Sequence, residues 1–294
     1  MCATCGCGGD GVRIGEAGHG HGHAPPGRHG HPDAVVSADG RHGDHRHSQR
    51  VEIEVDLLAG NEALAGRNRR RLDAAGIRAV NLMSSPGSGK TTLVERTVRD
   101  LGGEVPCAVL EGDQETALDA DRIAATGAPA VQINTGAGCH LDADMVARGL
   151  DALDPPPGSL VFVENVGNLV CPALFALGEH ARVVIMSVTE GADKPLKYPH
   201  MFRTADLVLL TKVDLLPYVD LDVARWVGYA RRARPGVAVL EVSATRGDGL
   251  DGWYDWLRGL VTSPATSPAT SPGTNSVRSS VTTAGPPPPP PARG

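Results

Sequence analysis

The segment Ser84–Thr92, which reads SSPGSGKTT, constrains the fold of this chain more than any other feature of the sequence. It follows the short apolar run of residues 77–83 and precedes a helical pattern, as a phosphate-binding loop does. Gly87 and Gly89 allow backbone N–H groups to turn inward around a phosphate, and the dipole of the following helix adds positive potential. Only the first glycine of the general pattern is missing, because Ser84 replaces it. The segment therefore predicts a nucleotide-binding α/β fold.

The side chains of this loop have expected roles. Lys90 is predicted to reach the β- and γ-phosphates and to act in catalysis, and the Thr91 hydroxyl is predicted to bind Mg²⁺. The residues that we expect to contact the nucleotide here are Gly87, Ser88, Gly89, Lys90, Thr91 and Thr92.

The rest of the core alternates apolar runs with helical patterns, which is typical of a parallel sheet. A helix is expected over residues 55–75, before the first strand at residues 77–83. Later strands are predicted at residues 108–111, 131–134, 160–164, 183–188, 207–211 and 237–242. The fold class predicted is therefore α/β, with a mostly parallel central sheet and helices on both faces.

Composition divides the chain into three regions. Residues 1–48 are rich in glycine and histidine and lack periodic apolar residues, so we expect a flexible tail there. Residues 49–261 are expected to form the nucleotide-binding domain. Residues 262–294 contain TSPATSPATSPG and a proline run, which predict a disordered tail without chemistry of its own.

The choice of base is indicated after the strand at residues 207–211. The Asp214 carboxylate can accept two hydrogen bonds from guanine, whereas adenine would leave it unpaired. Lys212 is expected to pack over the base, and a backbone N–H of Ser243 or Ala244 to meet the guanine oxygen. These residues predict a site for GTP and GDP.

Three cysteines at the N-terminus, Cys2, Cys5 and Cys7, form a C-x-x-C-x-C cluster. Three thiolates this close can bind one metal ion, with the terminal amine as a fourth donor. A planar donor set suits Ni²⁺ and a tetrahedral one suits Zn²⁺, so a structural zinc clip is the alternative. Eight of the eleven histidines lie between His19 and His47, which indicates storage of divalent ions.

With these motifs together, the chain resembles the hydrogenase-maturation nickel-insertion GTPases, the HypB family. The resemblance covers the N-terminal cysteines, the serine-first loop and the core. It implies a P-loop NTPase of the dimeric metallochaperone class, related to urease accessory GTPases and nitrogenase-iron-protein-like ATPases. Thr211 stands where members of the family usually carry asparagine.

The resemblance also implies roles for residues that the pattern leaves ambiguous. The first switch segment is residues 111–116, where Asp113 would orient the attacking water, accept a proton from it, or bind Mg²⁺ through a water. The second is residues 164–167, where Glu164 would contact Mg²⁺. No arginine is assigned to the γ-phosphate within the chain. A second metal site of Cys139, His140 and Cys171, for nickel or zinc, would lie at a dimer interface and change geometry on hydrolysis.

The expected protein is thus a Mg²⁺-dependent GTPase that delivers nickel to a hydrogenase large subunit with other maturation proteins. Two alternatives stay open: a nickel store with a regulatory nucleotide site, and a nickel chaperone for urease. The mild net charge of -6 gives no reason to expect nucleic acid. No long apolar run predicts a membrane span, and no signal peptide is recognised, so we expect the cytoplasm.

Overall fold

The computed structural model of this chain describes residues 13–16, 43–113, 118–136 and 138–262. Its centre is an eight-stranded sheet in the order β1-β4-β3-β5-β2-β6-β7-β8. All neighbouring strands run parallel except β1 and β4, which are antiparallel. The strands are β1 (Arg13–Glu16), β2 (Arg78–Ser84), β3 (Cys107–Asp113), β4 (Ala130–Asn134), β5 (Leu160–Glu164), β6 (Ala181–Ser187), β7 (Leu207–Thr211) and β8 (Ala238–Val242).

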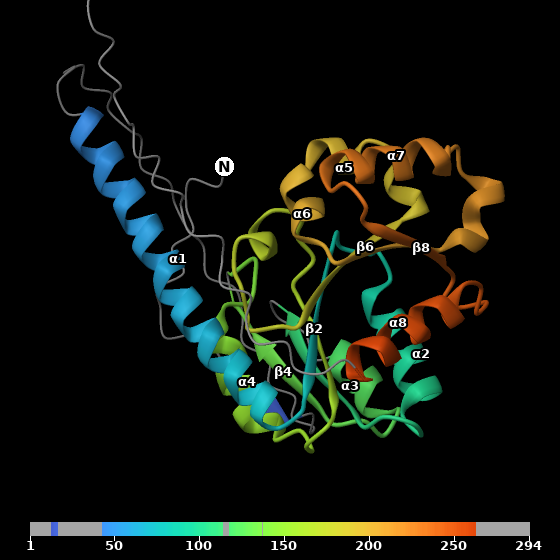
Figure 1. The fold of residues 1–294 in the computed structure, drawn as a ribbon, viewed down its shortest axis with the longest axis horizontal. Helices are drawn as coiled ribbons and strands as arrows, with labels where there is room; N and C mark the ends of the chain where they lie inside the picture. Colours follow the sequence, from blue (N-terminus) through green and yellow to red (C-terminus); the bar gives the residue numbers. More distant parts are fainter. Residues whose placement is uncertain (1–12, 17–42, 114–117, 137, 263–294) are drawn as a thin grey trace, which may run out of the picture. The chain divides into compact units, whose positions relative to one another are not determined.

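Helices cover both faces of this sheet (Figure 1). They are α1 (Gly43–Ala74), α2 (Lys90–Leu101), α3 (Leu118–Ala124), α4 (Ala143–Leu153), α5 (Lys194–Lys197), α6 (Pro199–Thr204), α7 (Val223–Ala233) and α8 (Leu250–Thr262). Short 3-10 helices lie at η1 (Cys171–Ala173), η2 (Val188–Glu190) and η3 (Val213–Tyr218). None of the described helices is long and apolar enough to cross a membrane.

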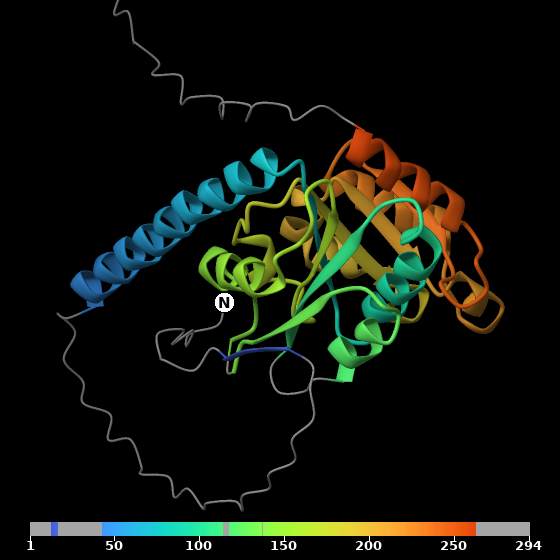
Figure 2. The same cartoon turned by 90° about the horizontal axis from the view of Figure 1, so that it is seen from below.

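The core is divided by the sheet into layers because successive side chains of a strand point to opposite faces. On one face, apolar residues of α2 and α8, such as Leu93 and Trp253, pack against Phe162 of β5. On the other face, α1 and α4 pack against the sheet through residues that include Leu72 and Leu150. Figure 2 shows α1 and α4 together, away from α2 and α3. Both faces of the central strands are therefore buried, as a parallel sheet requires.

The predicted fold class is confirmed by this architecture. The strands expected at residues 160–164 and 207–211 coincide with β5 and β7, and the other predicted strands differ by one or two residues at an end. Such ends depend on hydrogen bonds to neighbouring strands, which an apolar pattern does not report.

One element lies within residues 1–48, where the sequence predicted a flexible tail, and a second begins there. The strand β1 pairs with β4, so that Arg13 lies opposite Asn134. The helix α1 begins at Gly43, well before the predicted start at residue 55. The proposed domain boundaries at residues 48 and 261 remain predictions.

Two asparagines attach α1 to loops at the carboxyl edge of the sheet. Asn61 accepts a hydrogen bond from the backbone N–H of Ala143 at 2.9 Å and donates to the carbonyl of Ala176 at 2.8 Å. Asn68 donates to the carbonyls of Ala143 at 2.7 Å and Leu177 at 3.0 Å. Both side chains are buried, so these bonds replace water and hold α1 in one register.

The contact of α1 with Gly178 predicts a stability effect. Gly178 has a φ of 95°, and a Cβ there would lie 2.6 Å from the Ala65 carbonyl oxygen and 2.6 Å from the Asn68 Cβ. Gly178→Ala should therefore lower the free energy of unfolding by about 3 kcal/mol or more, because strain and a backbone clash combine. Denaturant unfolding measures this loss.

Gly158→Ala is the matched control, because Gly158 also has a positive φ of 78° but no atom within 4 Å of an added Cβ. Its cost should be about 1 kcal/mol, from the backbone conformation alone. Equal losses in the two variants would contradict the packing of α1 described above.

Candidate functional site

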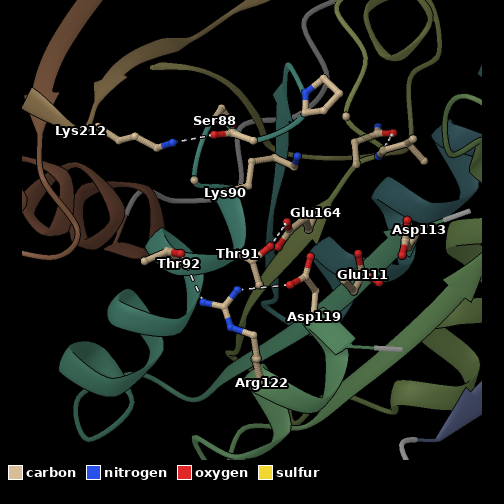
Figure 3. Close-up of a pocket in the computed structure, with 17 residues that line it drawn as sticks. Ser88, Lys90, Thr91, Thr92, Glu111, Asp113, Asp119, Arg122, Glu164 and Lys212 are labelled. Carbon is tan, nitrogen blue, oxygen red and sulfur yellow. Dashed lines mark hydrogen bonds and ion pairs between the residues drawn. The ribbon is translucent and has the colours of Figure 1, made fainter. Parts of the chain in front are cut away.

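The loop between β2 and α2 has the conformation that phosphate binding requires. Gly87 and Gly89 have φ of 72° and 94°, and Gly89 is the residue that precedes the first turn of α2. A side chain would strain both positions, so the two glycines are required by the backbone itself. The loop lines a cleft of about 520 Å³, to which both switch segments and Lys212 also contribute (Figure 3).

The two principal side chains of the loop contact buried partners. Lys90 donates from Nζ to the Ser84 hydroxyl at 2.9 Å, so the serine that replaces the usual glycine contacts the loop lysine. Thr91 donates from Oγ1 to Glu164 Oε1 at 2.7 Å. The structure thus brings Lys90, Thr91 and Glu164 to one end of the cleft, with Asp113 on its wall.

Three carboxylates lie close together in the cleft beside this loop. Oxygens of Glu111, Asp119 and Glu164 lie within 4.8 Å of one another. Glu111 and Glu164 are directly opposite in the paired strands β3 and β5, and both are 3% exposed. Burial, and then the Glu164 charge, raise the pKa of Glu111 to about 9, and burial also raises the pKa of Glu164.

These carboxylates fit a hard cation. In the described part of the chain, Glu111 Oε2 and Glu164 Oε2 are buried without a hydrogen-bond partner. Buried acceptors of this kind are costly unless a cation or donor meets them. Carboxylate and hydroxyl oxygens are the ligands that Mg²⁺ prefers, so Glu111, Glu164 and Thr91 suit it. Glu111 was not predicted as a site residue, although its place at a strand end beside residue 113 is a usable signal.

An arginine also lines the cleft, although none was assigned from the sequence. Arg122 on α3 donates to the Thr92 hydroxyl at 3.3 Å and to Asp119 at 3.3 Å (Figure 3). It also donates to Glu95 at 2.8 Å. Arg122 is therefore a residue of the cleft that the sequence analysis did not assign. The interpretation missed it because α3 reads as an ordinary solvated helix.

The residues predicted to bind the base lie beside the loop. Asp214 accepts a hydrogen bond from the Ser243 hydroxyl at 2.6 Å, which joins the two predicted base-binding segments and places Ala244 next to them. Lys212 has a left-handed φ of 59°, and its Nζ donates to the Gly87 carbonyl at 2.8 Å. Thr211, in place of asparagine, donates to the Ser88 carbonyl at 2.7 Å and so ties β7 to the loop.

A second cluster consists of Cys139, His140 and Cys171, whose ligand atoms lie within 4.8 Å of one another. The two sulfur atoms are 3.0 Å apart, and Cys139 Sγ is 3.7 Å from His140 Nδ1. The His140 ring stacks on Phe175 with centroids 4.0 Å apart, and burial lowers the pKa of His140, which favours the neutral form that binds metals. The structure therefore assembles the donor set that was predicted.

The remaining cysteines differ in character. Burial raises the pKa of Cys107 to about 11, which keeps its thiol protonated, in agreement with its interpretation as a packing residue. Cys2, Cys5 and Cys7 lie outside the described residues, as do most of the histidine tract and residues 114–116 of the first switch segment.

Comparisons with known proteins identify sequences similar to this chain. Residues 78–241 match the model of the CobW/HypB/UreG nucleotide-binding domain. The chain is 53% identical to the hydrogenase maturation factor HypB of Escherichia coli over 231 residues, which is 78% of each chain. It is 56% identical to HypB of Azotobacter chroococcum over 71% of this chain and 69% of the relative.

Solved structures agree with these relatives. A crystal structure of HypB from Archaeoglobus fulgidus is 42% identical, has a TM-score of 0.65, and covers 69% of this chain and 99% of its own. A crystal structure of HypB from Helicobacter pylori in complex with nickel is 34% identical, has a TM-score of 0.67, and covers 72% of this chain and 100% of its own.

The paired carboxylates predict a pH dependence of stability. Between the ordinary pKa of 4.5 and about 9, folded Glu111 holds a proton that the unfolded chain releases, so the stability of the nucleotide-free, Mg²⁺-free protein should fall as pH rises. Its melting temperature should drop by several degrees from pH 5 to pH 9, since about 1 kcal/mol corresponds to roughly 2–4 °C in a domain of this size.

Glu111→Gln should flatten this profile, because it removes the buried titration while it keeps the shape of the side chain. The control is Glu104→Gln, at a carboxylate that is exposed and paired with Arg258. A parent profile as flat as that of Glu111→Gln would show that the buried carboxylate does not titrate in this range.

Proposed function

The chain belongs to the CobW/HypB/UreG family and, within it, to the HypB hydrogenase maturation factors, and from that membership we propose that it is a GTP-hydrolysing nickel chaperone. It binds nickel as cargo and delivers it to the large subunit of a [NiFe] hydrogenase. One observation carries this proposal: the phosphate cleft and the Cys139–His140–Cys171 cluster are built on the same segment, because Glu164 lines the cleft and Cys171 follows seven residues later.

Hydrolysis is a phosphoryl transfer to water. The water oxygen bonds to the γ-phosphorus while the bond to the β–γ bridging oxygen breaks, which gives GDP and inorganic phosphate. Lys90 stabilises the charge of the β- and γ-phosphates, and Asp113 on the cleft wall orients the water. Arg122 adds a positive charge at the same cleft.

Thr91, Glu164 and Glu111 would hold Mg²⁺ at this site. When bound, it neutralises charge on the phosphate oxygens. The chain's own contribution is to hold two carboxylates at paired positions of β3 and β5, where water does not compete for them.

Guanine specificity comes from Asp214, which is oriented by Ser243. Its two oxygens accept from the ring N–H and the exocyclic amine of guanine, while Lys212 packs over the base and Ala244 supplies a backbone N–H. Ser88 and Thr92 contribute to phosphate binding.

Nickel binds at two places in this proposal. Cys2, Cys5 and Cys7 form a high-affinity site, and the Cys139–His140–Cys171 cluster binds nickel, or zinc, at the interface of a homodimer. The relative from Helicobacter pylori was solved in complex with nickel, which supports the choice of metal. The chain acts in the cytoplasm with other maturation proteins.

A second candidate client is urease. A relative from Helicobacter hepaticus, 42% identical over 60% of this chain, is named a hydrogenase/urease maturation factor. Storage of nickel by the histidine tract is a further alternative, in which the nucleotide does not control the metal.

The gated-chaperone proposal predicts that nucleotide changes nickel affinity. The full chain with Cys2, Cys5 and Cys7 replaced by serine retains the thiolates of Cys139 and Cys171, whose charge-transfer absorption with Ni²⁺ the histidine tract does not produce. Nickel affinity should differ at least tenfold between the GDP form and a form with a non-hydrolysable GTP analogue, which corresponds to about 1.4 kcal/mol of coupling.

Cys139→Ala in the same background should abolish the absorption and so confirms its source. Cys107→Ala is the matched control, because that thiol is buried in the core and should not contribute. Equal affinities in the two nucleotide forms would reject gating and favour storage.

Asp214→Asn tests the assignment of the base. The amide donates where guanine also donates, so GTP affinity should fall at least a hundredfold, while xanthosine triphosphate, which offers an acceptor there, should bind better than GTP. Titration with fluorescent nucleotides measures both. The exposed Asp220→Asn variant should keep the parent's preference, and unchanged GTP affinity in Asp214→Asn would refute the base site.

A further inference from the structure

The loop that carries Cys139 and His140 is held between the two switch segments. On one side, the N–H of Thr135 donates to the Asp113 carbonyl at 2.9 Å, which continues the pairing of β4 with β3. On the other side, the loop is bonded to Asn165, which directly follows Glu164. The backbone on both sides of the Cys139–His140 pair is therefore attached to residues that line the phosphate cleft or adjoin them.

Leu141, the residue after His140, contacts the first switch segment through its side chain. It is fully buried, and a Cβ built on Gly112 would lie 2.8 Å from Leu141 Cγ and from Leu141 Cδ1. Gly112 is itself part of the cleft wall between Glu111 and Asp113. A shift of the first switch segment toward the core would therefore press directly on Leu141, since close-packed interiors transmit strain.

The backbone of Leu141 contacts the second switch segment. Its N–H donates to Asn165 Oδ1 at 3.1 Å in a bond that is buried. The same oxygen accepts from the N–H of Val166 at 3.0 Å, and Asn165 Nδ2 donates to Asn81 Oδ1 at 3.3 Å.

Asn165 is consequently fixed at both its backbone and its side chain. It is 1% exposed, and its own N–H donates to the Leu82 carbonyl on β2 at 3.0 Å. Its carboxamide cannot turn without leaving the buried N–H of Leu141 unpaired, which is unfavourable in a site from which water is excluded. A movement of Glu164 must then either break this bond or carry Leu141 with it.

We propose that Asn165 and Leu141 are the positioning residues that couple the phosphate end of the cleft to the Cys139–His140–Cys171 cluster. A change around Glu164 passes through the Asn165 carboxamide to the N–H of Leu141, and so to the adjacent His140. The first switch segment acts on the same residue through Gly112. This inference rests on the proposed function, because it names the residues that carry its nucleotide control.

The coupling differs from a route along the chain from Glu164 to Cys171. A chain route passes through Asn168, which accepts from the N–H of Val170 at 2.8 Å beside Cys171. The proposed route instead crosses between two loops and reaches the other half of the cluster. Substitutions at Asn165 and Asn168 therefore separate the two routes.

The experiment uses the full chain with Cys2, Cys5 and Cys7 replaced by serine, and Ni²⁺ as the probe. Nickel affinity is measured in the GDP form and in the form with a non-hydrolysable GTP analogue, and the ratio of the two affinities is the readout. Asn165→Ala should reduce this ratio to less than a third of the parent's value, because the carboxamide link is lost. Melting of the GDP-bound variant reports whether it is folded.

Two variants control for general damage. Asn165→Asp keeps the oxygen that accepts from Leu141, so it should retain the parent's ratio within threefold, which a merely structural role would not predict. Asn168→Ala should also retain the ratio. Should Asn165→Ala fail to fold, Asn165→Ser replaces it, because serine keeps a polar group at the buried position but is too short to reach Leu141.

The outcomes distinguish failure of the positioning role of Asn165 from failure of nucleotide gating itself. A parent ratio of tenfold or more that persists within threefold in the folded Asn165→Ala or Asn165→Ser variant overturns this inference and leaves nucleotide gating intact. A parent ratio near one overturns nucleotide gating, and the positioning role with it. A ratio lost in Asn168→Ala but kept in Asn165→Ala assigns the coupling to the chain route and also overturns the inference.

Discussion

Glu111 and Glu164 face each other from adjacent parallel strands, and much of the site depends on how their charges are met. Both carboxylates are buried, both have raised pKa values, and each has an oxygen without a hydrogen-bond partner among the described residues. Two such groups are unfavourable side by side unless a cation or a proton joins them. A bound cation would remove this unfavourable interaction, and so would favour an ordered arrangement of the segments on which the two residues lie. These are the segments that contact the phosphate-binding loop and Leu141.

The metal-binding cluster also depends on the order of the strands. The order of the strands places β5 between β3 and β2, so the loops that follow all three strands meet at one edge of the sheet. Helix α1 connects two loops at this edge. Asn61 and Asn68 both bond to Ala143, which follows the Cys139–His140 loop. They also bond to Ala176 and Leu177, which follow Cys171. The two halves of the thiol and imidazole cluster are held together by a helix that contributes no donor atom. The bonds of Asn61 and Asn68 therefore restrain movement of one half of the cluster relative to the other.

The sequence predicted the parts of this molecule whose chemistry depends on local order. The loop from Ser84 to Thr92 and the segment around Asp214 lie next to the strands that position them, so an apolar run and a few neighbouring residues are enough. The roles of Glu164 and of the Cys139–His140 pair needed the family resemblance, because their local pattern is ambiguous. Glu111 and Arg122 were missed because their role comes from partners that are distant in the chain. Glu111 stands at a strand end beside Asp113, but its part in a cation site follows from the position of Glu164 opposite it in β5. Similarly, β1 has too short and too mixed a pattern for recognition, because its strand conformation comes from pairing with β4.

That pairing has a consequence for the edge of the sheet. Without β1, the strand β4 would present a row of unpaired backbone donors and acceptors, and an open edge of this kind is a template for pairing with a second chain. The four residues of β1 occupy that row in the antiparallel sense. The edge of the sheet is thus a strand of only four residues, which offers few backbone groups for edge-to-edge aggregation. A chain that lacks β1 would expose the longer edge of β4 and should therefore precipitate more readily, whatever its metal content.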